Sequence, residues 1–411
     1  MRESPPTHFV GLDIGTSTVR CVVGMQRPGD ARPSIIGHGR SQNMGMRKGV
    51  VVHSDDVTEA IVQAITEAER VSGVHIDRAT VNINGAHVSG INSKGVIAIS
   101  AANREITVED RLRVEEAAAV VQLPPNREII QVFAKNYSLD GQPNIKDPVG
   151  MHGVRLEVDT HIVTAATPNL RNLSTALEKA QILPTRYTVS SLAAAEALLT
   201  RQQREAGTVL IDIGAGTTNI VVIEDGEVQH VAVLPIGGTH ITNDLAIGLK
   251  TDLDVAEEVK VKHASLQKNN KKLTVSVSNK DGHYTYDSSD ITMITEARVE
   301  ELLEYVDREL HKIHRSRKLP GGAVLSGGTA KLPGMAEFTR DTLQVAARVG
   351  KIQPLTGLVD TVDDPSYYAA IGLMLLDMLL LPDEHHESGK RQSTFNVPGV
   401  LDNFIGYFKR H

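Results

Sequence analysis

The sequence is poor in cysteine, since Cys21 is the only one among 411 residues. A single thiol excludes a framework of disulfides and favours a reducing compartment. Cys21 stands inside a run of apolar residues that is typical of a β-strand, where a free thiol usually packs as a small hydrophobic side chain. We therefore expect Cys21 to lie in a core without a chemical role.

The sequence also lacks a long apolar run. No stretch reaches the roughly 18 apolar residues needed to cross a bilayer, and residues 1–6 have none of the apolar character of a secretory signal. The nearest candidate, residues 369–381, is too short and contains Asp377, so it predicts a buried helix. These absences favour a protein that stays inside the cell and does not span the membrane.

Positive charge is not in excess, because 43 lysines and arginines face 50 aspartates and glutamates, which gives a net charge of -7. Such a chain has no long-range attraction to nucleic acid, so we expect no nucleic-acid partner. The composition, with 41% apolar and 23% charged residues, is that of a folded soluble protein with room for two or more domains.

An internal repeat is present. Residues 9–24 and 208–223 align without gaps at seven identities in 16, at a separation of 199 positions. Each copy has two β-rich runs around a turn of glycine, serine and threonine, which is the pattern of a hairpin with a polar tip. Alternating strand and helix patterns follow each copy, so the repeat predicts an α/β protein with two similar lobes.

Each copy of the repeat places an aspartate near the end of its first run and a glycine two positions later. Glycine allows a tight turn whose N–H groups, with neighbouring hydroxyls, point at phosphate oxygens, while the aspartate would hold Mg²⁺ through water. One such turn is more often only a polar hairpin, but two copies favour opposed clamps on one nucleotide. The expected clamp residues are Asp13, Gly15, Thr16 and Ser17, and then Asp212, Gly214, Gly216, Thr217 and Thr218.

Three further segments complete the expected nucleotide site. Glycines after an apolar strand would let an adenine ring approach the backbone. An acidic and a basic residue at i and i+3 of a helix could bracket the ribose and base, although such a pair is usually only a surface ion pair. These segments contain Gly327, Gly328 and Thr329; Glu257 and Lys260; and Gly237 and Gly238 in a turn at the end of a strand.

With these segments in this order, the sequence resembles the actin, Hsp70 and sugar-kinase superfamily. It resembles more narrowly the FtsA family of bacterial cell-division proteins, through residues 140–157, residues 326–334 and a detached apolar segment at the C-terminus. The resemblance covers nearly the whole chain. It implies an α/β, actin-like two-lobed ATPase fold with an inserted subdomain and a C-terminal amphipathic helix.

The resemblance also implies a domain division. We expect the first lobe core in residues 1–83 and 161–195, the inserted subdomain in 84–160, the second lobe core in 196–227 and 294–381, and its small subdomain in 228–293. A flexible linker, 382–395, would precede the terminal helix, 396–411.

The function implied by the resemblance is that of a division protein with ATP and Mg²⁺ as cofactors. It would self-assemble into polymers, bind the C-terminal tail of FtsZ, anchor the Z ring to the cytoplasmic face of the membrane at the division site, and help recruit later division proteins. In the family the small subdomain of the second lobe receives the FtsZ tail, so Arg298 and Glu301 become candidate contacts. Their segment fits an amphipathic helix with solvated charges equally well.

Two residues depart from the pattern of that family and superfamily. Thr18 stands where the family often carries a lysine, so one charge on the phosphates is missing there. Asn219 stands where a residue helps to orient the attacking water or the metal, and an amide cannot act as a base. ATP hydrolysis, which needs a positioned water and charge stabilisation, is therefore expected to be slow or absent.

The C-terminal residues have apolar positions at i, i+3, i+4, i+7, i+8 and i+11, which is one continuous helical stripe. Two basic residues at its end could reach anionic lipid headgroups. The alternative is a helix that docks on its own core, but the polar linker before it favours a membrane contact. The stripe consists of Val397, Val400, Leu401, Phe404, Ile405 and Phe408, followed by Lys409 and Arg410.

Two other functions fit the same hairpins. A small-molecule kinase would need a carboxylate base in the cleft, which the sequence does not identify, and it would not need the terminal stripe. A pilus-assembly scaffold of the same fold would bind a peptide of a membrane protein instead of lipid. The amphipathic stripe at the C-terminus favours lipid and so argues against this alternative.

Overall fold

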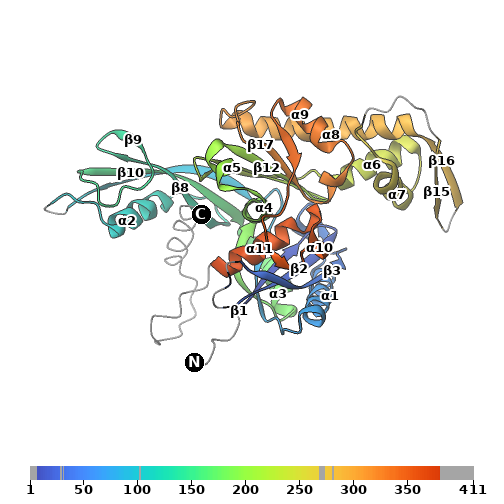
Figure 1. The fold of residues 1–411 in the computed structure, drawn as a ribbon, viewed down its shortest axis with the longest axis horizontal. Helices are drawn as coiled ribbons and strands as arrows, with labels where there is room; N and C mark the ends of the chain where they lie inside the picture. The colour runs from blue at the N-terminus through green and yellow to red at the C-terminus, as the bar shows by residue number, and fades with distance from the viewer. Residues whose placement is uncertain are drawn as a thin grey trace.

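The computed structural model describes residues 7–27, 30, 32–100, 103–267, 274–279 and 282–379. These residues fold into an α/β molecule with two large sheets, two small two-stranded sheets and two lobes (Figure 1). The expected linker, 382–395, and the expected terminal helix, 396–411, lie outside the described residues, so the membrane contacts stay predictions.

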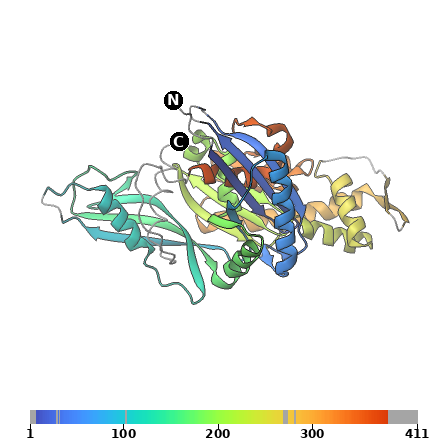
Figure 2. The ribbon, with the colours of Figure 1, turned by 90° about the horizontal axis from the view of Figure 1, so that it is seen from below.

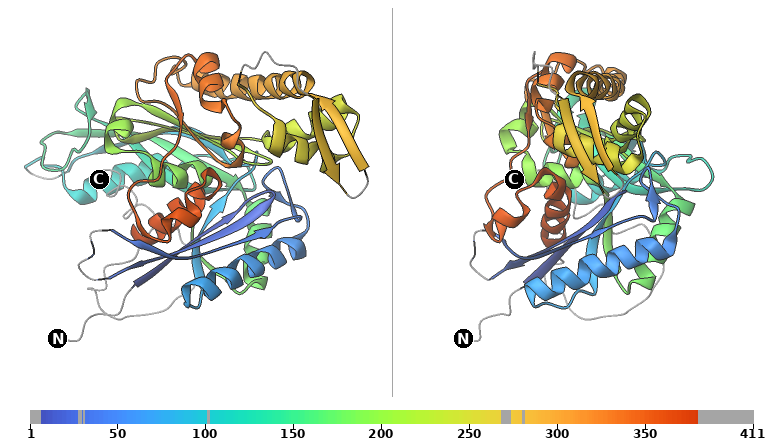
Figure 3. Two further views of the ribbon diagram at one scale, coloured as in Figure 1. Left: turned by 45° about the vertical axis from the view of Figure 1, so that its right-hand side comes forward. Right: turned by 90° about the vertical axis from the view of Figure 1, so that its right-hand side faces the viewer.

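One lobe is built on a six-stranded sheet with the order β11-β6-β1-β2-β3-β19. The helices α1 (Ser54–Ser72) and α3 (Thr167–Lys179) cover one face, because their apolar residues pack against those of the central strands (Figure 3). Cys21 lies in this core with no exposed surface, as expected. The strands are β1 (Thr7–Ile14), β2 (Thr18–Gln26), β3 (Ser34–Gln42), β6 (Arg78–Ile83), β11 (Leu183–Val189) and β19 (Thr356–Gly357).

Two helices, α4 (Ser190–Leu198) and α11 (Tyr368–Leu379), lie between the two sheets and share one core with both. The buried helix predicted from residues 369–381 is confirmed by α11. Its carboxylate, Asp377, is 7% exposed and accepts hydrogen bonds from the backbone N–H of Val10 at 3.0 Å and from the hydroxyls of Thr80 and Thr185, each at 2.8 Å. The charge in this apolar helix is therefore fully hydrogen-bonded, which burial of a carboxylate requires.

The second sheet has nine strands in the order β18-β17-β12-β13-β14-β7-β10-β8-β9. Its strands β7, β8 and β9 and the first half of β10 come from the segment expected to form the inserted subdomain, and they continue the sheet of the second lobe. Their link to it is narrow, because only Ala232 of β14 pairs with Ser89 of β7. The strands are β7 (Ser89–Ala98), β8 (Arg127–Leu139), β9 (Gln142–Ile145), β10 (Arg155–Ala166), β12 (Thr208–Ile213), β13 (Thr218–Glu224), β14 (Glu227–Leu234), β17 (Gly322–Ser326) and β18 (Ala347–Val349).

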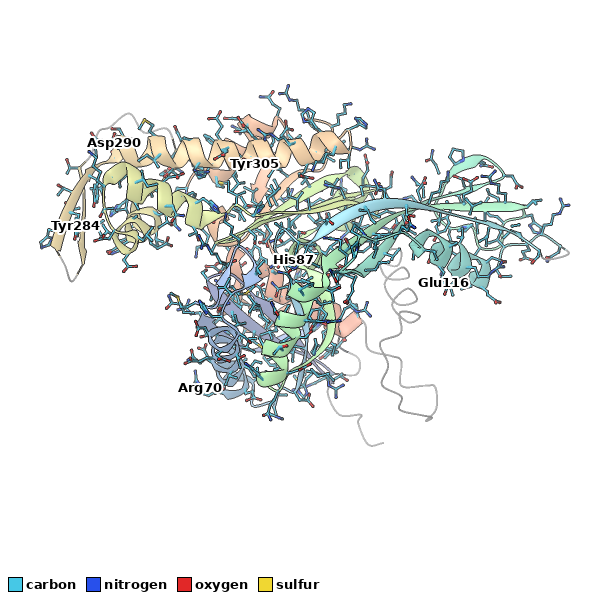
Figure 4. All side chains as sticks on the ribbon, turned by 180° about the vertical axis from the view of Figure 1, so that it is seen from behind. Arg70, His87, Glu116, Tyr284, Asp290 and Tyr305 are labelled. Atoms are coloured by element: carbon cyan, nitrogen blue, oxygen red, sulfur yellow. The ribbon has the colours of Figure 1, made fainter. Side chains whose placement is uncertain are left out.

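The helix α2 (Val108–Ala119) of the inserted segment and the hairpin of β15 (Thr274–Asn279) and β16 (Gly282–Asp287) lie at opposite ends of the molecule (Figures 1 and 2). Figure 4 shows this separation through Glu116 at one end and Tyr284 at the other. The long helix α8 (Ser288–Lys312) joins the hairpin to the second lobe. It packs against α6 (Gly238–Leu249) and α7 (Leu253–His263) in the second large core.

The remaining short elements connect these layers. They are β4 (Met46–Arg47), β5 (Val50–Val51), α5 (Arg201–Ala206), the 3-10 turn η1 (Gly328–Lys331), α9 (Met335–Leu343), α10 (Val359–Val362) and the 3-10 turn η2 (Pro365–Tyr367). Among the described residues, no helix combines the length and apolar character that crossing a bilayer requires.

Candidate functional site

A cavity of about 310 Å³ opens between the tips of the two repeated hairpins. Both repeats form antiparallel hairpins, β1–β2 and β12–β13, as the sequence predicts. Fourteen residues expected in the site line this cavity: Asp13, Gly15, Thr16, Ser17, Asp212, Gly214, Thr217, Asn219, Gly238, Glu257, Lys260, Gly327, Gly328 and Thr329. Segments as far apart as β1 and η1 thus meet around one space.

Three expected residues do not line the cavity. Thr218 is buried on β13, where its hydroxyl donates to the carbonyl of Ile236 at 2.8 Å. Gly216 faces the first hairpin, and a Cβ there would come within 2.8 Å of the Thr16 side chain. Gly237 packs against the second tip, since a Cβ would lie 2.6 Å from the carbonyl oxygen of Gly214. These two glycines let the tips and the next turn approach closely.

The two hairpin tips have the same turn. The N–H of Gly15 donates to the carbonyl of Thr18 at 3.1 Å, and the N–H of Gly214 donates to the carbonyl of Thr217 at 2.9 Å. A Cβ on Gly15 would sit 2.7 Å from that Thr18 oxygen, so the first turn needs glycine. The repeated sequence therefore encodes two equivalent polar tips that face each other across the cavity.

Asp13 and Asp212 form the acidic floor of the cavity, and each is only 7% exposed. Burial raises the pKa of the Asp13 carboxyl to about 7; Arg20 opposes the rise and the charge of Asp212 adds to it. Burial likewise raises the pKa of Asp212 to about 6, against hydrogen bonds from Asn219 and Ser326. A cation bound beside these two carboxylates would offset the cost of ionising them in a buried place.

The donor set fits a hard divalent cation. Within the described residues no group of three or more histidines, cysteines or carboxylates could hold a metal by itself. A cation near Asp13 and Asp212 would therefore complete its shell with water and phosphate oxygens, which is how Mg²⁺ is commonly bound.

The amides around the aspartates hold them in place. Asn82 donates to Asp13 at 2.5 Å and to the hydroxyl of Ser190 at 3.0 Å. In the second hairpin, Asn219 donates from Nδ2 to Asp212 at 3.3 Å, and its Oδ1 is buried without a hydrogen-bond partner. The Asn219 amide thus orients a carboxylate and keeps an acceptor atom unused beside the cavity.

The helix α7 contributes an ion pair to the cavity wall. Lys260 Nζ lies 2.6 Å from Glu257 Oε2, as the i, i+3 spacing predicts. The same ammonium donates to the hydroxyl of Thr242 at 2.9 Å and to the carbonyl of Gly238 at 3.3 Å. These hydrogen bonds to the start of α6 hold the ion pair in place, so it forms an ordered polar part of the cavity wall.

The glycines after β17 form another part of the cavity wall. Gly327 has φ 85°, and a Cβ there would lie 2.4 Å from the carbonyl oxygen of Ile213, so this position needs glycine both for its backbone conformation and for its close contact. The hydroxyl of Thr329 donates to the carbonyl of Gly214 at 3.2 Å. This bond ties the glycine segment to the second hairpin tip.

The sequence analysis missed several residues that line the cavity. Asn84, Ser190 and Ser366 stand in no repeated motif, and the fold brings them in from distant segments. Arg20 had a usable signal, because the repeat aligns it with Asn219 at the separation of 199. The others are Ala215, Val261, Ala264, Lys331, Leu332, Pro333 and Ala369; Thr18, noted in the sequence as a departure from the family, lines the cavity as well.

Arg298 and Glu301 do not line the cavity; both lie on α8. The Arg298 guanidinium pairs with Asp244 of α6, at 2.9 Å for one of its two contacts, and with Glu301. Hydrogen bonding to Asp244 raises the pKa of Arg298. The hydroxyl of Tyr305, which is labelled in Figure 4, donates to Glu301 at 3.4 Å. These charges form a partly buried network between two helices.

Comparison with known proteins identifies related sequences. The family model described as "Cell division protein FtsA" matches residues 209–372, and the model "SHS2 domain inserted in FTSA" matches residues 85–164. The cell division protein FtsA of Pseudomonas aeruginosa is 34% identical over 371 residues, which is 89% of this chain and 88% of that protein. FtsA of Bacillus subtilis is 38% identical over 370 residues, with 89% and 82% covered.

Solved structures share the fold at low sequence identity. The PilM-PilN type IV pilus biogenesis complex matches with TM-score 0.63 and 18% identity over 91% of this chain and 99% of that one. MreB5 of Spiroplasma citri bound to ADP matches with TM-score 0.54 and 13% identity over 90% and 96%. The MamK double helical filament matches with TM-score 0.51 and 14% sequence identity over 91% of this chain and 99% of that one. These likenesses confirm the expected actin-like fold.

Proposed function

Because this chain belongs to the FtsA family and is a cell-division protein of actin-like fold, we propose that it binds ATP and Mg²⁺ in the cavity between the two hairpins. The observation that carries this proposal is that both repeated tips and both buried aspartates face one cavity. Its volume is within the range of small-molecule sites. MreB5, which shares this fold, was solved bound to ADP, which supports a nucleotide as the ligand of the fold.

Each group in the cavity has a proposed role. The N–H groups and hydroxyls of the two tips bind the phosphates, and Asp13 and Asp212 hold Mg²⁺ through its waters. Glu257 and Lys260 contact the ribose or base from α7, and the backbone near Gly327 and Gly328 contacts the base from the segment after β17. When bound, Mg²⁺ neutralises phosphate charge.

Hydrolysis of ATP is proposed to be slow at most. Asn219 stands opposite Asp212 in the β12–β13 ladder, and its amide can position a water but cannot remove a proton from it. The two carboxylates on the cavity floor, Asp13 and Asp212, are proposed to hold the metal. They are therefore not assigned the role of a base that activates water. The nucleotide would therefore act mainly by holding the lobes together, and its chemistry would be secondary.

The proposed cellular role is to anchor FtsZ filaments, the Z ring, to the cytoplasmic face of the membrane at the division site. Self-assembly into polymers would occur through this actin-like body, as in the filament formed by the structurally similar MamK. The FtsZ C-terminal tail would contact the α6–α8 side of the second lobe, near Arg298 and Glu301. Later division proteins would be recruited to the same polymer.

The membrane anchor is proposed to be residues 396–411. Six apolar side chains on one helical face gain free energy by burial in lipid, but ordering the helix costs a similar amount, so one tail binds weakly. Several tails on one polymer would bind together at high effective concentration. Assembly and membrane attachment should therefore depend on each other.

Co-sedimentation with anionic liposomes tests this proposal. The full chain and a chain that ends at Gly389 would be spun with vesicles, each with and without Mg-ATP. We expect only the full chain to pellet, and to pellet more strongly with Mg-ATP. If both chains stay in solution under every condition, residues 396–411 are not a membrane anchor and the anchoring role is wrong.

A further inference from the structure

The short hairpin of β4 and β5 is held against the tip of the first repeated hairpin. Its two turn residues, Lys48 and Gly49, have φ values of 50° and 75°, as tight two-residue turns require. The N–H of Gly49 donates to the hydroxyl of Thr16 at 3.1 Å, and a Cβ on Gly49 would lie 2.7 Å from the backbone nitrogen of Gly85. The hairpin is therefore fixed on the first lobe, with the exposed Lys48 in its turn.

Lys48 lies next to the second lobe. Thr16, which holds the hairpin, meets that lobe directly, because a Cβ on Gly216 would lie 2.8 Å from the Thr16 side chain. His240 stands in the first turn of α6, where its Nδ1 accepts a hydrogen bond from the N–H of Gly237 at 3.1 Å. Burial lowers the pKa of His240, the hydrogen bond with Gly237 opposes the lowering, and the charge of Lys48 adds to it. The ammonium of Lys48 is thus close to α6 although it belongs to the other lobe.

A second cation approaches the same imidazole from α8. The charge of Arg298 also lowers the pKa of His240, but its guanidinium is already paired with Asp244 and Glu301. Within the part of the chain that the structure describes, Lys48 has no ion pair and no hydrogen bond from its ammonium. The α6–α8 side of the molecule therefore meets an unpaired positive charge at the border between the lobes.

We propose that Lys48 is a first-lobe contact for an acidic side chain of the peptide that binds near Arg298, so that the peptide site spans both lobes. This inference rests on the proposed function, because it assumes that the FtsZ C-terminal tail binds beside α6 and α8. An ammonium on a flexible four-carbon stem can reach a carboxylate without a fixed geometry, which suits a residue at an exposed turn.

Two other roles for Lys48 fit the structure less well. Lys48 does not line the nucleotide cavity, which argues against a phosphate as its ligand. A permanent bridge to Asp244 would need an acid without a partner, but Asp244 accepts two hydrogen bonds from Arg298. A carboxylate supplied by a bound peptide carries no competing bond of this kind, so it is the better match for the ammonium.

A peptide bound in this way would connect the two lobes. The nucleotide is proposed to hold the same lobes together from inside the cavity. Two ligands that favour one arrangement of the lobes strengthen each other's binding. We therefore expect Mg-ADP to raise the affinity for the peptide, and we expect Lys48 to carry part of that increase.

Fluorescence anisotropy of a labelled peptide of the FtsZ C-terminal tail, titrated with the full-length protein, tests the proposal. We expect Lys48→Gln to weaken binding about two- to fivefold, as loss of an exposed charge pair does, and Lys48→Glu to weaken it further. Both effects should shrink at high salt, because exposed charges are screened. The matched control is Arg47→Gln, since Arg47 is the exposed neighbour of Lys48 on β4 and should leave binding unchanged.

Peptides in which one acidic residue at a time is changed to its amide identify the partner of Lys48. One of these changes should weaken binding to the wild type and have little further effect on Lys48→Gln, which is the sign of a direct pair in a double-mutant cycle. The same titrations with Mg-ADP should show a larger gain in peptide affinity for the wild type than for Lys48→Gln.

The outcomes separate this role from the proposed function. If Arg298→Ala weakens peptide binding and Lys48→Gln does not, the role of Lys48 is wrong while the peptide site stands. If Arg47→Gln weakens binding as much as Lys48→Gln, or if Mg-ADP affects the wild type and Lys48→Gln equally, the contact is not a specific one between the lobes, and the proposal is also wrong. If the wild type does not bind the peptide, the proposed FtsZ contact fails, and the role of Lys48 fails with it.

Discussion

The imidazole of His161, on β10, accepts a hydrogen bond at Nε2 from the backbone N–H of Val231, on β14, at 3.0 Å. Its other nitrogen, Nδ1, lies 2.8 Å from Oδ1 of Asn92, so Nδ1 carries the proton and the ring is neutral. The bond reinforces the narrow place where the sheet of the inserted segment joins that of the second lobe, next to the single pair Ala232–Ser89. A hydrogen bond from the backbone to a side chain thus adds to the single backbone pair that joins β14 to β7.

This histidine predicts a loss of stability in mild acid. Burial, with His230 and Lys135 nearby, lowers the pKa of His161 to about 3 from 6.5. Below pH 6.5 the unfolded chain takes up a proton that the folded chain refuses, so stability is full above pH 6.5 and falls as the pH drops toward 3. Between pH 7.5 and 5, His161 should lower the free energy of unfolding by about 2 kcal/mol.

Urea unfolding at pH 7.5 and pH 5 measures this effect. The variant His161→Gln should be less stable at pH 7.5 but should lose less stability on acidification than wild type. The control is His152→Gln, since His152 is exposed in the same inserted segment and should leave the pH dependence unchanged. An equally steep loss in His161→Gln would show that other groups carry the acid sensitivity.

The buried carboxylate of α11 predicts a large effect on stability. Asp377→Ala leaves the N–H of Val10 and the hydroxyls of Thr80 and Thr185 without their acceptor, and unsatisfied buried donors cost about 1 to 3 kcal/mol each. We expect a loss of about 3 kcal/mol or more in urea unfolding. Asp377→Asn keeps one acceptor oxygen, so it should lose clearly less; equal losses would contradict the hydrogen-bond explanation.

The raised pKa of Asp13 predicts that Mg²⁺-dependent nucleotide binding strengthens with pH. Asp13 holds a proton up to about pH 7, and a carboxylate must lose its proton to hold the cation. Affinity for Mg-ADP should therefore rise about tenfold at most from pH 6 to pH 8. The same titrations of ADP in excess EDTA measure the pH dependence of binding without Mg²⁺. Subtracting that dependence removes the contribution from ionisation of the nucleotide itself. The variant Asp13→Asn should remove most of the remaining slope and leave about a twofold rise from the ionisation of Asp212. A slope as steep as that of the wild type would exclude Asp13 as its source.

The α6–α8 network predicts the outcome of changing Arg298. Arg298→Ala should weaken binding of a peptide of the FtsZ C-terminal tail at least several-fold, because it removes a cation and releases Asp244 and Glu301. Fluorescence anisotropy of the labelled peptide measures this change. The matched control is Arg308→Ala, on the same helix, whose pair with Glu304 is longer, at 3.7 Å, and more exposed. Equal peptide binding by wild type and Arg298→Ala would place the tail elsewhere.

Features of the site that depend on neighbouring residues were predictable from the sequence. The hairpins, their polar tips and the aspartates near the strand ends follow from the repeat, because ladder register and turn geometry are decided within about 16 residues. The burial of Cys21 and of the helix α11 followed from apolar pattern alone. Even Arg20 and Asn219 could be paired by the repeat, since each stands seven positions after its aspartate.

Only the tertiary structure decided which distant groups meet. Asn82 reaches Asp13 across 69 positions, and Tyr367 comes to rest under Arg20 only after the chain has built both lobes. The close approach of Gly216 to Thr16 and the bond from Val231 to His161 belong to the same class. A sequence pattern reports which face of a strand or helix is buried, but the partner of that face depends on the order of strands and on packing. For this reason the sequence by itself determined the two polar hairpins and the family, while the fold determined that Arg20 lies against Tyr367 and that the inserted segment extends the sheet of the second lobe.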